Sequence, residues 1–161
     1  MARNPYGKPA TGYSSVPQGG SPIHTEAWAL IEAARRIAEA IAAYEQNPSR
    51  EAIKSIRDVL RLNWRVWTIF QAELTAESSP IPPELRINML TLCKYVDTQT
   101  VALLAQMDPE RALQLVDINR NIATGLLEGL NKALAESAET KEKSTPQAAV
   151  GPSAKPIDKT A

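Results

Sequence analysis

The chain has 161 residues, and 18 Lys and Arg side chains are balanced by 18 Asp and Glu, so the formal net charge is zero. This length suits one domain with a core large enough to fold alone. A balanced charge argues against general nucleic-acid binding, because affinity for phosphate backbones comes from a surplus of basic side chains. With one cysteine, Cys93, and one histidine, His24, the chain can form neither an intramolecular disulfide nor a Cys/His zinc site.

The start of the chain lacks the apolar run of a secretory signal. Charged residues also interrupt every later apolar stretch before it reaches the length of a membrane span. We therefore expect a soluble, cytoplasmic protein that does not insert into a membrane and that holds no metal or cofactor.

Both ends of the chain have the composition of disordered segments. Residues 1–20 contain three prolines and four glycines, and residues 135–161 are small, charged and proline-containing. Such segments bury too little apolar surface to offset the entropy lost on ordering. We predict a disordered N-terminal tail over residues 1–20, a helical domain over 21–134 and a disordered C-terminal tail over 135–161.

The first two helices are predicted over residues 22–46 and 48–76. Each begins at a proline that directly follows a capping residue, at Ser21–Pro22 and Asn47–Pro48. Their apolar residues recur at steps of three and four, which lines one helix face and differs from the alternation of a strand. The two stripes are Ile23, Ala27, Leu30, Ala34, Ile37, Ile41 and Tyr44, and then, with Asn63 as one polar interruption, Ile53, Ile56, Leu60, Asn63, Trp67, Phe70 and Leu74.

The third and fourth helices are predicted over residues 83–106 and 109–134, the fourth with Asp108 as N-cap ahead of Pro109. Short connections favour antiparallel neighbours, so we predict an all-α, four-helix bundle of up-down type. The two further stripes are Leu85, Met89, Leu92, Val96 and Leu103, and then Leu115, Ile118, Ile122, Gly125 and Gly129.

Residues that could carry catalysis are few. His24 lies at the start of the first helix and Cys93 within the third, where a small core or boundary residue is expected. The folded part has no glycine cluster to hold a phosphate. Most acids lie one helical turn from a base, as ordinary surface pairs. We therefore predict no catalytic residues and a protein that is not an enzyme. Examples of these pairs are Glu32 with Arg36, Arg35 with Glu39 and Asp58 with Arg61.

A row of basic residues on the second helix has two interpretations. Its members share one helix face: Arg50, Lys54, Arg57, Arg61 and Arg65. Arg57, Arg61 and Arg65 could contact an anionic partner such as RNA or an acidic protein surface. Alternatively, the row is a solvated face that neighbouring acids partly neutralise. Trp64 is the one aromatic residue near it, so a base-stacking platform is not indicated.

Aromatic side chains concentrate in the second helix at Trp64, Trp67 and Phe70. Trp67 and Phe70 continue the apolar stripe, so core packing is the first expectation. Trp64 lies off the stripe and belongs either to the core edge or to an exposed groove that contacts a partner. Asn63 lies in the stripe and needs a hydrogen-bond partner there, either from Asn119 or Arg120 of the fourth helix or from another protein.

Gly125 and Gly129 are one turn apart in the fourth helix. This spacing is typical of helices that approach closely. The alternative is a helix whose C-terminal part is only marginally stable, because each glycine costs about 1 kcal/mol relative to alanine.

Three linked motifs lie in order along the predicted helical domain. Residues 62–74 contain an N-x-x-hydrophobic-W-T-x-F pattern, and residues 81–86 form a proline-led segment continued by Asn88, Leu92 and Val96. Residues 118–126 match the closing I-N-R-x-I-A-x-G-L motif, and Ala33–Arg36 fits the first helix. Together these motifs resemble the FlaF family of bacterial flagellar biosynthesis regulators, and the likeness covers about residues 23–130, in the order that the family has.

The resemblance implies a non-enzymatic cytoplasmic protein needed for flagellin production and export. Family members are thought to bind flagellin as secretion chaperones and to work alongside FlbT, a post-transcriptional regulator. We expect capture of flagellin's helical terminal segments in a groove. The candidate contacts are Trp64, Trp67, Phe70, Arg86, Asn119 and Arg120. The alternatives are regulation of flagellin messenger RNA, directly through the basic row or with FlbT, and a structural role in the export apparatus.

Overall fold

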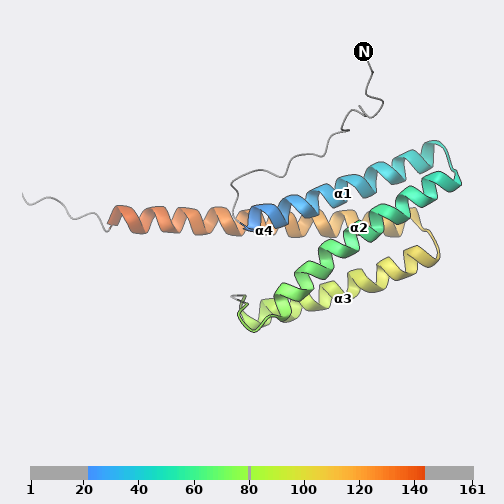
Figure 1. Ribbon diagram of the computed structural model, residues 1–161. Helices are drawn as coiled ribbons and strands as arrows, with labels where there is room; N and C mark the ends of the chain where they lie inside the picture. The colour runs from blue at the N-terminus through green and yellow to red at the C-terminus, as the bar shows by residue number, and fades with distance from the viewer. Residues whose placement is uncertain (1–21, 80, 144–161) are drawn as a thin grey trace, which may run out of the picture.

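The computed structural model describes residues 22–79 and 81–143 and places them in four helices (Figure 1). These helices are α1 (Pro22–Gln46), α2 (Arg50–Thr75), α3 (Pro83–Ala105) and α4 (Pro109–Lys143). The prediction of an all-α fold with four packed helices is confirmed. The expected N-terminal tail over residues 1–20 lies outside the described residues, as do residues 144–161 of the tail expected over 135–161, whereas residues 135–143 are helical.

The four helices form a bundle that is closed at one end and open at the other. α1 packs extensively against α4 and also against α2, whereas α3 packs mainly against α2 and touches α4 least. Figure 1 shows α1 and α4 running side by side, while the α2–α3 hairpin diverges from them toward the start of α1. The start of α1 and the end of α2, which lie opposite the loop that joins these two helices, are therefore separated.

Capping residues explain where the helices begin. Asp108 Oδ1 accepts a hydrogen bond of 3.2 Å from the backbone N–H of Arg111, which confirms the predicted cap of α4. The predicted start of α2 at residue 48 is wrong. Ser49 has an extended backbone and its Oγ accepts from the Ala52 N–H at 3.1 Å, so Ser49 is the N-cap and α2 begins at Arg50. Ser21 lies outside the described residues.

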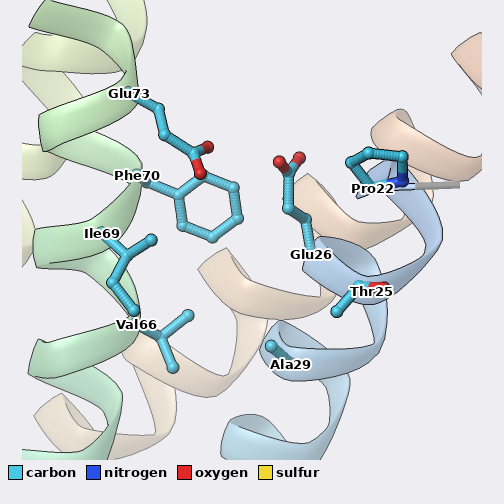
Figure 2. Close-up of a pocket in the computed structure, with 8 residues that line it drawn as sticks. All are labelled: Pro22, Thr25, Glu26, Ala29, Val66, Ile69, Phe70 and Glu73. Atoms are coloured by element: carbon cyan, nitrogen blue, oxygen red, sulfur yellow. The ribbon is translucent and has the colours of Figure 1, made fainter. Parts of the chain in front are cut away.

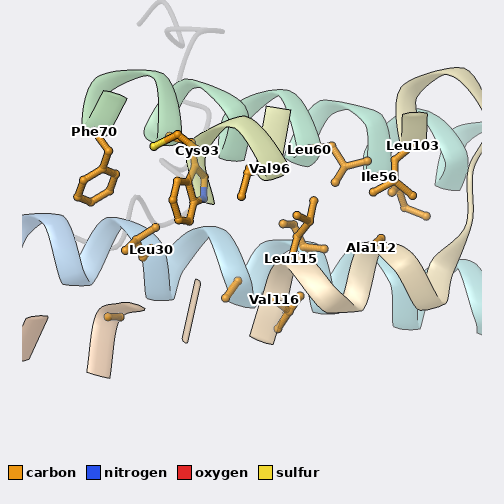
Figure 3. Close-up of a cluster of buried hydrophobic side chains, with 14 of the residues drawn as sticks. Leu30, Ile56, Leu60, Phe70, Cys93, Val96, Leu103, Ala112, Leu115 and Val116 are labelled. Carbon is orange, nitrogen blue, oxygen red and sulfur yellow. The ribbon is translucent and has the colours of Figure 1, made fainter. Parts of the chain in front are cut away.

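The core follows the predicted stripes of α1 and α2. Buried side chains from all four helices meet between the helix axes, as Figure 3 shows. Trp67 is the largest of them and is 1% exposed. Full burial of a large apolar side chain is worth about 1.5–3 kcal/mol before entropy costs. This apolar burial is what holds the bundle together.

The predicted stripe of α3 is wrong in its first half. The residues that α3 buries are Cys93, Val96, Thr100 and Leu103. Leu85 is 52% exposed, and Met89 and Leu92 are only partly buried. The reason is tertiary: the first turns of α3 lie where the α2–α3 hairpin has diverged from α1 and α4, so few helices are close enough to cover them. Cys93 is a buried residue, as expected.

The face of α4 that packs in the core differs from the predicted face, and the helix is longer than predicted. It buries Ala112, Leu115, Val116, Asn119 and Ala123. Both Gly125 and Gly129 are exposed, and a Cβ built on either would meet nothing within 4 Å, so the predicted close helix approach is wrong. α4 continues to Lys143, past the predicted end at 134, and is 35 residues long against 25 for α1. Its last turns extend beyond the start of α1 (Figure 1).

Candidate partner-binding groove

The described residues give no sign of a catalytic or metal centre. No group of three or more His, Cys, Asp or Glu within residues 22–79 and 81–143 could hold a metal ion. His24 is exposed in the first turn of α1, and Cys93 is 1% exposed. Burial, and then the charge of Asp97, raises the pKa of the Cys93 thiol, so this cysteine is a poor nucleophile. None of the four helices has the length and apolarity needed to cross a membrane.

A buried polar chain links α2 to α4 in the middle of the bundle. Trp67 donates its indole N–H to Asn119 Oδ1 at 2.9 Å, and Asn119 Nδ2 donates to Asn63 Oδ1 at 2.6 Å. Asn63 therefore finds one of the two partners predicted for it on α4. Asn63 and Asn119 are 0% exposed. Asn119 and Trp67 thus have no surface for another protein in this conformation, which corrects their placement among the candidate contacts.

The open end of the bundle holds a groove between α1 and α2, with a volume of about 330 Å³ (Figure 2). Each helix contributes residues spaced by three, four and seven positions, which lie on one helix face. Because the two faces diverge, their side chains do not fill the space between them. The lining residues are Pro22, Thr25, Glu26 and Ala29 from α1, and Val66, Ile69, Phe70 and Glu73 from α2.

The floor of the groove is apolar. Phe70 extends from α2 into the space toward α1 (Figure 2), and its ring lies 5.9 Å from that of Trp67, at a tilt of 48°. Trp67 is locked by Asn119, so the polar chain holds the floor in position. Ile69, on the rim, is 61% exposed although it is a large apolar side chain. An apolar floor with an exposed isoleucine beside it is typical of a surface that another apolar segment covers.

Two acids face each other across the mouth of the groove. Glu26 on α1 and Glu73 on α2 direct their carboxyl groups toward the same space (Figure 2). Partial burial, and then the charge of Glu73 and a hydrogen bond to it, raise the pKa of Glu26 above its usual value of 4.5. None of the eight lining residues is basic. The groove therefore combines an apolar floor with an unneutralised acidic mouth.

The other candidate contacts lie in different surroundings. Trp64 is half-buried and donates its indole N–H to Asp97 Oδ1 of α3 at 2.7 Å, so it belongs to the α2–α3 contact. Arg86 Nη2 donates to the backbone carbonyl oxygens of Ile81 at 3.2 Å and Ser79 at 3.4 Å, which ties down the loop before α3. Arg120 is exposed on α4. Of the predicted contacts, only Phe70 lines the groove.

The basic row of α2 is partly neutralised. Lys54 Nζ and Arg61 Nη1 each lie 3.1 Å from a carboxylate oxygen of Asp58, and hydrogen bonding to Lys54, with the charges of both bases, holds the Asp58 pKa below its usual value. Arg57 is half-buried, whereas Arg65 is exposed and takes part in no ion pair among the described residues. Arg61 and Arg65 line a shallow depression together with Trp64 and Thr68.

Five residues that line the groove were not among the contacts predicted from the sequence. Ala29 and Glu26 gave no signal, because a groove depends on how far two helices diverge and not on either helix alone. Ile69 did offer one: it is an apolar residue outside the predicted stripe of α2. Glu73 and Val66 lie beside the stripe and become significant only when α1 is placed opposite them.

Comparison with known proteins supplies the family context. A family model described as "Flagellar protein FlaF" matches residues 10–126. The matched range includes the groove, the buried polar chain and all three motifs noted in the sequence. It ends before Gly129 and the last turns of α4. No curated protein and no solved structure gives a match.

Proposed function

The chain belongs to the FlaF family of flagellar proteins, and from this premise we propose that it binds flagellin in the cytoplasm as a non-enzymatic secretion chaperone. In this proposal the α1–α2 groove receives a helical segment from one end of flagellin. The bound flagellin is kept from polymerising before export. The observation that supports the proposal most directly is the apolar groove with an exposed rim in a family of flagellar proteins.

The groove has the features of helix-in-groove recognition. In this mode an amphipathic helix lays its apolar face between two helices of the receptor, and a few anchors carry most of the binding energy. Phe70 and Val66 form the floor that an apolar anchor would touch, and Ile69 would be covered by the incoming helix. Trp67 and Asn119 hold that floor in place from within the core.

The test is titration of purified flagellin against the full chain, by calorimetry or fluorescence. Ile69→Asp places a charge on the apolar rim, and we expect it to weaken binding by about tenfold or more, because the incoming helix would bury that charge without a partner. Ile87→Asp is the matched control, because Ile87 is 64% exposed on α3 and does not line the groove. Absence of wild-type binding at tens of micromolar, or equal weakening by both variants, would contradict the proposal.

A second candidate function is regulation of flagellin messenger RNA, directly or together with FlbT. The observation that favours it is the pair of exposed arginines, Arg61 and Arg65, beside Trp64 in a shallow depression. In a gel-shift assay, direct RNA binding should weaken steeply with salt and on replacing Arg57, Arg61 and Arg65 by glutamine. Unchanged RNA affinity in that triple variant would rule out this surface, and pull-down with FlbT would test the indirect route.

A further inference from the structure

Binding of an apolar segment does not by itself explain the two acids at the mouth of the groove. Glu26 and Glu73 approach each other over an apolar floor, and neither forms an ion pair with a described residue. Two carboxylates that share a partly desolvated space repel each other, and a cation placed between them relieves that repulsion. The groove is therefore complementary to a segment that carries a positive charge beside its apolar face.

We infer that the α1–α2 groove selects a flagellin helix in which a Lys or Arg flanks the apolar anchor, with its cationic head seated between Glu26 and Glu73. This inference rests on the proposed function and adds the chemical identity of the recognised segment. The apolar floor supplies the contact area, and the two acids supply specificity and orientation. A helix with an acidic residue at the same position is rejected by like charge.

The size of the groove fixes the length of the recognised segment. The lining residues span 22–29 on α1 and 66–73 on α2, which is about two helical turns, or roughly 10 Å, on each wall. One apolar anchor against Phe70 and one basic residue a turn away fill this length. Lys and Arg suit the arrangement because their aliphatic stems pack along apolar surface while their charged heads reach the acids.

Because Glu26 can gain or lose a proton, the inference predicts how the affinity for flagellin depends on pH. The pKa of Glu26 is raised above its usual value in the free protein, so its carboxyl group keeps a proton to a higher pH than an ordinary glutamate does. A bound cation favours the ionised pair, so binding releases a proton in that range. Affinity for flagellin should therefore rise as pH increases through the raised pKa of Glu26 and level off above it.

The experiment measures flagellin binding by calorimetry with the full-length wild type, the double variant Glu26→Gln/Glu73→Gln and a control double variant Glu45→Gln/Glu77→Gln. Glu45 and Glu77 are exposed acids outside the groove, so the control makes the same change in net charge. We expect the groove variant to bind about tenfold more weakly at low salt, with a flatter dependence on salt and pH. The control should stay within about twofold of the wild type. Circular dichroism confirms that each variant is folded.

Each other result overturns the inference in a distinguishable way. If Ile69→Asp abolishes binding while the groove double variant binds as the wild type does, the acids play no part and the proposed function still stands. If the wild-type protein does not bind flagellin, both the inference and the proposed function are wrong. If neutralising the acids tightens binding, the occupant is a basic segment of this chain, such as the one with Arg3 and Lys8. If sedimentation shows a dimer that the double variant dissociates, the occupant is a second copy.

Discussion

Asn119 on α4 accepts the indole N–H of Trp67 on α2, 52 residues earlier in the chain, across a distance of 2.9 Å. The backbones of these two helices do not pack against each other, since α2 packs on α1 and α3. The contact is therefore a diagonal one through the core, extended by the bond from Asn119 to Asn63. Because the Trp67 ring packs on that of Phe70, which lines the groove, this contact holds the groove floor in position.

Replacing Asn119 by alanine should destabilise the protein by about 2–4 kcal/mol, because Trp67 Nε1 and Asn63 Oδ1 would both lose their buried partner. Urea denaturation followed by tryptophan fluorescence measures the change. Asn121→Ala on the same helix is the control, since Asn121 is exposed and its replacement should stay within about 0.5 kcal/mol. A loss below about 1 kcal/mol for Asn119→Ala would show that the diagonal contact contributes little.

Replacing Gly125 by alanine should stabilise α4. An added Cβ meets nothing within 4 Å and the helix gains propensity, so we expect about 0.5–1 kcal/mol, with a similar gain at Gly129. Thermal unfolding measures the gain, and hydrogen exchange locates it in residues 120–134. Destabilisation by Gly125→Ala would contradict this prediction. It would mean that another helix, for example one from a partner, packs closely against Gly125.

Glu26→Gln should make the protein more stable at neutral pH. The pKa of Glu26 is raised on folding, so the folded state holds its proton more tightly and stability falls as pH rises from 4.5 through the raised pKa. The variant removes this cost, by less than about 1 kcal/mol because the group is partly exposed to solvent. Denaturation at pH 7 and at pH 4 checks the sign: the gain should be present at pH 7 and shrink at pH 4.

Glu32→Gln should destabilise the protein at neutral pH, the opposite of the effect expected for Glu26→Gln. Glu32 accepts hydrogen bonds from Arg35 at 2.7 and 2.9 Å and from Arg36 at 2.8 Å, and these bonds lower its pKa to about 2. Its stabilisation is complete above pH 4.5 and is lost as pH falls toward 2. We expect the variant to lose about 0.5–1 kcal/mol at pH 7, the scale of a surface ion-pair network, and almost nothing near pH 2. A pH-independent loss would instead point to packing.

The sequence predicted those parts of the fold that depend on one helix at a time. The stripes of α1 and α2 were correct because their apolar residues recur on a single face and leave one way to bury them. The cap at Asp108 and the pairs of Glu32, Arg35 and Asp58 were correct because each involves neighbours along one helix. Leu85 was wrongly assigned to the core, since its burial depends on how far α1 and α4 extend beside α3.

The groove could not be predicted for the same reason. Phe70 was identified as a candidate contact from its type and position, but the facing wall of α1, with Glu26 and Ala29, required knowledge of the angle between two helices. Residues 135–143 were assigned to a tail because they have no apolar stripe. They nevertheless form helix, since their alanines, glutamates and lysines are strong helix formers without any packing.

The length of α4 has a consequence for every measurement of stability. Residues 131–143 are exposed throughout and extend past α1, so no packed layer makes their melting cooperative with the bundle. An isolated helical end frays gradually on heating, in a series of small steps. Far-ultraviolet circular dichroism sums over this end and the bundle, whereas tryptophan fluorescence reports on the bundle alone, because Trp28, Trp64 and Trp67 lie in α1 and α2. Transitions recorded by the two probes should therefore not coincide, and a two-state fit of the dichroism curve would underestimate the cooperativity of the core.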